Sequence, residues 1–86
     1  MRNLEDIGKL DAREAIKELD KWISGHPDDD EAYTLRGLRH WSLNHRREAI
    51  NDYLAALRIN PQSKARMALE YANSILDYYN KDLLNP

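Results

Sequence analysis

Three histidines are the residues of this 86-residue chain that would best suit a metal site or acid–base chemistry. His40 and His45 are five positions apart, about 140° around a helix, whereas two ligands on one helix face stand four apart. Asn44 is expected to break the helix between them, so we predict that the two rings do not converge. His26 lies in a predicted turn. We therefore expect surface or capping roles for the histidines and no bound metal.

A second feature is a basic patch that could bind phosphate groups. It consists of Arg36, Arg39, Arg46 and Arg47 together with His45. The alternative is a solvated, ion-paired face, because Glu48, Asp52 and the acids of 28–31 are close in sequence. The whole chain carries 13 Lys+Arg against 15 Asp+Glu, a net charge of −2. Binders of nucleic acid or anionic membrane usually have a clear basic excess, so we expect neither partner.

Residues for catalysis are not arranged in any recognisable motif. The absence of cysteine excludes disulfides, thiolate zinc sites and cysteine nucleophiles. The sequence has no Gly-rich phosphate loop, and no Ser, His and acid fall at the spacing of a nucleophile motif. We therefore predict that the chain is not an enzyme and needs no cofactor.

Helices must position whatever site the chain contains. Apolar residues after Asp11 recur with the helical period as far as about Ser24, and Asp11 suits the N-cap. Asn44 can adopt a positive φ and so turn the chain at a helix end, and Asn60–Pro61 marks the end of the following helix. Helices are predicted over 11–24, from the acidic cluster at 28–31 to about 43, and between Asn44 and Asn60. A further helix is predicted from 64, after a Ser63 cap, to about 79. Residues 2–7 are expected to form at most a short helix.

A sequence repeat with a period of 34 residues relates these helices to one another. The tetrapeptide REAI occurs at 13–16 and again at 47–50, and Pro27 and Pro61 keep the same offset. A period of this length is typical of helical repeats, in which a single helix pair cannot bury its own apolar face.

The stretch 30–63 resembles a tetratricopeptide repeat, with six matches in register: Tyr33, Gly37, Ala49, Tyr53, Ala56 and Pro61. An earlier partial repeat keeps Ala15 and Pro27 in phase. The resemblance implies an all-α fold of antiparallel helix-turn-helix repeats, an α-solenoid fragment of about four to five helices. It divides the single domain 1–86 into one complete repeat, about 30–63, two partial repeats, 1–29 and 64–80, and a short C-terminal tail, 81–86. Gly37 and Ala49 would then face each other where two helices cross, with Tyr53 beside them.

In this family ligands lie on the concave surface formed by the first helix of each pair. Residue by residue, that surface maps onto Thr34, Leu38, Trp41, Ser42, Ala68, Ala72 and Ile75, with Leu4 and Ile7 from the N-terminal stub. This groove would be apolar. Some members of the family bind a peptide's terminal carboxylate with Lys, Arg and Asn side chains at these positions. Here the corresponding residues are Thr34, Leu38 and Ala68, so this mode of binding is not expected. For Trp41 the alternatives are contact with a ligand and packing in the core.

The leading hypothesis is a protein-interaction module that binds another protein or peptide through this apolar groove. The alternative is a structural self-assembling unit, such as a homodimer, because the last helix has more apolar surface than one neighbour covers. The tail 81–86 folding back is an intramolecular version of the same idea. Nucleic-acid or phosphate binding through the arginines is third. We expect a cytoplasmic location, as for the small bacterial repeat proteins that the chain resembles. Residues 1–6 contain no signal-peptide core, and no apolar run approaches about 18 residues.

Overall fold

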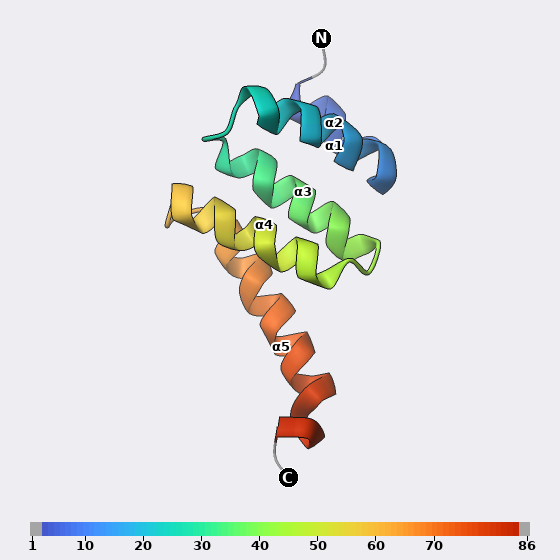
Figure 1. The fold of residues 1–86 in the computed structure, drawn as a ribbon, viewed down its shortest axis with the longest axis vertical. Helices are drawn as coiled ribbons and strands as arrows, with labels where there is room; N and C mark the ends of the chain where they lie inside the picture. The colour runs from blue at the N-terminus through green and yellow to red at the C-terminus, as the bar shows by residue number, and fades with distance from the viewer. Residues whose placement is uncertain (1–2, 85–86) are drawn as a thin grey trace.

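The computed structural model describes the backbone of residues 3–84 and the side chains of residues 3–77. This part of the chain forms five α-helices and no strand (Figure 1). The helices are α1 (Leu4–Gly8), α2 (Ala12–Gly25), α3 (Asp30–Ser42), α4 (Arg46–Ile59) and α5 (Ala65–Leu84). The all-α class predicted from the sequence is confirmed. The repeat arrangement implied by the tetratricopeptide resemblance stays a prediction.

Short polar side chains set the starts of the helices. Asp11 caps α2 by accepting from the Glu14 amide at 3.0 Å, as predicted. Asp29 caps α3 by accepting from two backbone amides, those of Glu31 and Ala32. Ser63 accepts from the amide at the start of α5, 3.1 Å away. These caps satisfy amides that have no partner inside a helix, so the chain enters these three helices at defined residues.

The turn between α3 and α4 depends on Asn44, which has a φ of 65°. The Asn44 amide donates to the Trp41 carbonyl at 2.9 Å, and the His45 amide donates to the His40 carbonyl at 2.8 Å. This pair of bonds is the Schellman pattern, in which a left-handed residue ends a helix and folds the chain back over its last turn. The positive φ expected for Asn44 is therefore confirmed, and α4 starts directly beside α3.

The two helices α3 and α4 approach each other closely where they cross. Gly37 is buried there, and a Cβ added to it would lie 2.6 Å from Tyr53 Cε1 and 3.1 Å from the Ala49 carbonyl oxygen. Ala49 is 0% exposed and Tyr53 1% exposed. Burial, and secondarily the charge of Asp52, raises the pKa of Tyr53 above its ordinary value. Only glycine permits this contact, because any side chain would overlap the tyrosine ring.

Two clusters of apolar side chains form the core. The first joins α1, α2 and α3 through Ile7, Ala15, Leu19, Ile23 and Ala32, and the second joins α4 and α5 through Ala49, Tyr53, Ala56, Ala65 and Ala72. Tyr33 on α3 packs against both clusters. Pro27 and Pro61 lie outside them, in the exposed turns after α2 and α4. The core is therefore continuous along the four N-terminal helices and the first half of α5.

The last helix is longer than the sequence suggested. It continues to Leu84, so residues 81–84 are helical and the prediction of a separate tail over 81–86 was wrong for these four. Neither glycine nor proline interrupts the chain between Tyr79 and Leu84, and Pro86 is the first residue that opposes a helix. Residues 85–86 lie outside the described residues. In Figure 1 the C-terminal half of α5 runs away from α4, which does not support the expected fold-back.

Among the helices of the described chain, none combines the length and the apolar content needed to cross a bilayer.

The crossing of α3 and α4 predicts that Gly37→Ala destabilises the fold. The added methyl would overlap the Tyr53 ring, at an expected cost of about 1–3 kcal/mol in the free energy of unfolding, measured by urea denaturation. Gly25→Ala is the matched control, because nothing lies within 4 Å of its added Cβ and its φ is not positive. Gly25→Ala should stabilise by up to about 1 kcal/mol. Equal effects of the two substitutions would show that the close contact at Gly37 is not real.

Candidate functional site

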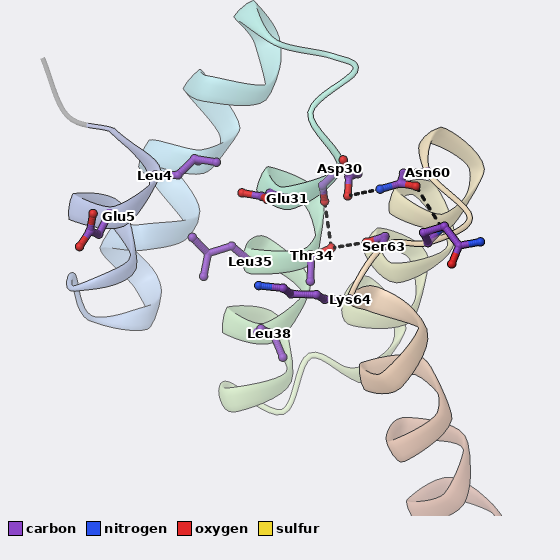
Figure 2. A pocket seen from close by; sticks show the side chains of 11 residues that line it. Leu4, Glu5, Asp30, Glu31, Thr34, Leu35, Leu38, Asn60, Ser63 and Lys64 are labelled. Carbon is purple, nitrogen blue, oxygen red and sulfur yellow. Dashed lines mark hydrogen bonds between the residues drawn. The ribbon is translucent and has the colours of Figure 1, made fainter.

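A groove of about 450 Å³ opens between α1, one side of α3 and the turn that joins α4 to α5 (Figure 2). Three structural elements border it, two from the N-terminal half of the chain and one from the C-terminal half. The lining residues are Leu4, Glu5, Asp30, Glu31, Thr34, Leu35, Leu38, Asn60, Gln62, Ser63 and Lys64.

One side of the groove is apolar. Leu4 on α1 and Leu35 on α3 pack against the first core cluster with one part of their surface and face the groove with the rest. Leu38, one helical turn after Leu35, is 43% exposed. A leucine this exposed beside two half-buried ones is apolar surface still available to a ligand.

The opposite side is held by a short chain of hydrogen bonds between α3 and the α4–α5 turn. The Thr34 hydroxyl donates to the Asp30 carbonyl at 2.9 Å, so the Ser63 hydroxyl is the donor in its 3.1 Å contact with Thr34. Ser63 also accepts the amide of Ala65 at 3.1 Å. The Asn60 amide adds a longer bond to the Asp30 carboxylate, at 3.4 Å. Thr34 and Ser63 are both buried, so this network fixes the turn against α3 and preforms the groove.

Charged groups stand at the rim. Three carboxylates line the groove, those of Glu5, Asp30 and Glu31, together with one ammonium, that of Lys64. Glu5, Glu31 and Lys64 are exposed, and none of them forms an ion pair with another described residue. In Figure 2 the Lys64 side chain extends from the α4–α5 turn towards α3, between the levels of Thr34 and Leu38. The rim is thus acidic near the start of α3 and carries its one cation farther along the helix.

Of the residues expected to line the groove, Leu4, Thr34 and Leu38 do so. Ala72 and Ile7 are each 1% exposed and belong to the core. Ser42 donates to the Arg39 carbonyl, and neither it nor Ala68 nor Ile75 lines the groove. Instead, α5 packs on α4, and the groove is lined by residues of the turn that precedes α5 and by no described residue of α5 itself. The sequence reasoning missed Leu35 and the α4–α5 turn, although the Ser63 cap marked that turn.

Trp41 also lies away from the groove. Its ring makes an edge contact with Tyr71, at 6.4 Å between centroids, and the Arg46 guanidinium lies 4.4 Å from its centroid. Trp41 packs against the second core cluster. The structure therefore favours the packing role over the ligand role for this tryptophan.

Two of the three histidines differ from expectation. The Nδ1 atoms of His40 and His45 are 3.1 Å apart, so the prediction that these rings do not converge was wrong. The left-handed Asn44 folds residue 45 back over the end of α3, an effect that helical spacing cannot describe. His26 stacks on Trp22 and donates Nδ1–H to its carbonyl, which is a capping role. Among the described residues, no three His, Cys, Asp or Glu side chains group as a metal site.

Two of the four arginines bind groups within the fold. Arg36 makes two hydrogen bonds to Asp52, at 2.8 and 3.0 Å, and a third to Asp20 at 2.9 Å. The hydrogen bonds to Asp52 raise the pKa of Arg36 above its ordinary value. Arg39 donates to the Gly8 carbonyl on α1. The ion-paired alternative therefore describes Arg36, which connects α2, α3 and α4.

Comparisons of the chain with protein-family models, with curated proteins and with solved structures find no match. The function must therefore be argued from the groove itself.

The ion pairs of Arg36 predict unequal roles for its two partners. Asp52→Asn should lower the free energy of unfolding by about 1.5–3 kcal/mol, because it leaves a half-buried guanidinium without its paired carboxylate. Asp20→Asn is the matched control, and since the Asp20 side chain is 58% exposed, it should cost less than about 1 kcal/mol. Urea denaturation at neutral pH measures both. If Asp20→Asn lowered the free energy of unfolding as much as Asp52→Asn, the unequal roles of the two carboxylates would be contradicted.

Proposed function

We propose that this chain is a protein-interaction module that holds a short polypeptide segment in the groove between α1, α3 and the α4–α5 turn. The observation that carries the proposal is Leu38, 43% exposed on the apolar side of the groove beside Leu4 and Leu35. Leucines in a groove give a partner segment its apolar contacts, and polar groups on the opposite side fix its orientation. The proposal includes no catalytic step and no cofactor.

The hydrogen-bonded side supports this use of the groove. Because Thr34 and Ser63 already satisfy each other, the buried polar groups need no ligand to be stable. A partner then binds a preformed surface, which lowers the ordering cost of association. In the proposed tetratricopeptide arrangement, α1 and α3 are first helices of successive repeats, the elements that contact ligands in that family. A cytoplasmic location is part of the same proposal.

The second candidate is self-association through α5. Met67 and Tyr71 are one turn apart on this helix and are 75% and 61% exposed. Side chains of this size, exposed together, are typical of a surface that another chain covers. This face is separate from the groove, so the two candidates are tested separately.

The groove predicts that Leu38→Asp abolishes peptide binding. Peptides selected from a random display library on the wild-type chain should bind Leu38→Asp at least about tenfold more weakly, because a charge replaces the exposed apolar contact. Leu54→Asp is the matched control, since Leu54 is 45% exposed and does not line the groove. Fluorescence anisotropy measures both affinities. Equal losses in the two variants, or none at Leu38, would contradict the proposed function.

Self-association predicts a solution mass that rises with protein concentration. Light scattering from micromolar to millimolar chain should show this rise, and Tyr71→Lys should remove it by placing a charge on the exposed face. Leu54→Lys, on the exposed side of α4, is the control. A monomer mass at every concentration would eliminate the second candidate and leave the first unaffected.

A further inference from the structure

The groove is more acidic than the chain as a whole. The full sequence carries 13 basic and 15 acidic side chains, whereas the groove is lined by three carboxylates and one ammonium. The carboxylates come from two helices, Glu5 from α1 and Asp30 and Glu31 from α3. All three line the groove because α1 and the start of α3 both border it, and in Figure 2 Glu5 lies apart from the two α3 carboxylates.

Helix capping does not explain these carboxylates. Asp29 already accepts the amides of Glu31 and Ala32, so the α3 start does not need Asp30 or Glu31 as hydrogen-bond acceptors. A favourable interaction with the helix dipoles remains, because Asp30 and Glu31 are in the first turn of α3 and Glu5 is in the first turn of the short α1, but it leaves their charge available to a ligand. Glu5 and Glu31 therefore contribute negative potential to the groove that no described side chain neutralises through an ion pair.

The position of Lys64 gives the groove a direction. Its side chain crosses the groove near Leu38, whereas Glu31 lies at the start of α3 (Figure 2). A partner's basic side chain would be attracted to the α3 start, and an acidic side chain there would be repelled. The apolar contacts with Leu4, Leu35 and Leu38 lie alongside these charges.

Resting on the proposed function, we infer that the segment held in this groove is amphipathic and basic. Its apolar side chains pack on Leu4, Leu35 and Leu38, and a lysine or arginine lies against Glu31 at the start of α3, while Glu5 on α1 adds to the negative potential. Charge complementarity then selects this class of segment over acidic peptides of equal apolarity.

Two synthetic peptides of one length and one pattern test this inference: an amphipathic Leu/Lys peptide and its Leu/Glu counterpart. Fluorescence anisotropy at low salt should show the Leu/Lys peptide binding at least about tenfold more tightly. Glu31→Gln should weaken the Leu/Lys peptide about three- to fivefold. Glu48→Gln is the matched control, because it changes the net charge equally on an exposed part of α4 outside the groove. Circular dichroism of each variant establishes that the fold is kept.

Each outcome is decisive. Equal or tighter binding of the Leu/Glu peptide overturns the inference, as does an equal loss in Glu31→Gln and Glu48→Gln, which would show non-specific attraction. If both peptides bind equally and both are lost with Leu38→Asp, the groove function stands and the basic preference is wrong. If neither peptide binds, or if Leu38→Asp affects neither, the proposed function is wrong as well.

Discussion

The contact of Gly37 with the Tyr53 ring is the constraint on which the rest of the structure depends. It holds α3 and α4 so close that a methyl group at residue 37 would overlap the ring. At this distance Asp52, next to Tyr53 in sequence, reaches Arg36, next to Gly37, in a two-bond ion pair. The end of α4 is then near the start of α3, where Thr34 and Ser63 join. The groove therefore exists because the helix crossing is close.

Sequence reasoning succeeded where the determinants are local. Asp11 as a cap and Asn44 as a left-handed residue follow from side-chain chemistry within a few positions. The 34-residue sequence repeat placed Ala15 and Ala49 at positions that are 0% exposed. Small residues at a fixed period carry this information, because only they let helix backbones approach.

Sequence reasoning failed where the contacts of a residue depend on the direction of a turn or helix in three dimensions. Helical spacing separated His40 from His45, but the turn at Asn44 brings their Nδ1 atoms to 3.1 Å. The groove mapping took Ala72 from the last helix as a lining residue, whereas Ala72 is in the core and the α4–α5 turn forms one side of the groove. Leu35 was missed because repeat positions alone do not show which leucine faces an opening. Crossing angles and turn directions depend on contacts between distant segments, which a single sequence does not display.

The central claim is that apolar side chains of a partner contact the leucines of the groove. Intermolecular NOEs between an unlabelled Leu/Lys peptide and the isotope-labelled chain measure this contact directly. NOEs are expected from the peptide's leucine methyls to the methyls of Leu4, Leu35 and Leu38. NOEs confined to Met67 and Tyr71 on α5 would contradict the central claim and would move the binding surface to the last helix.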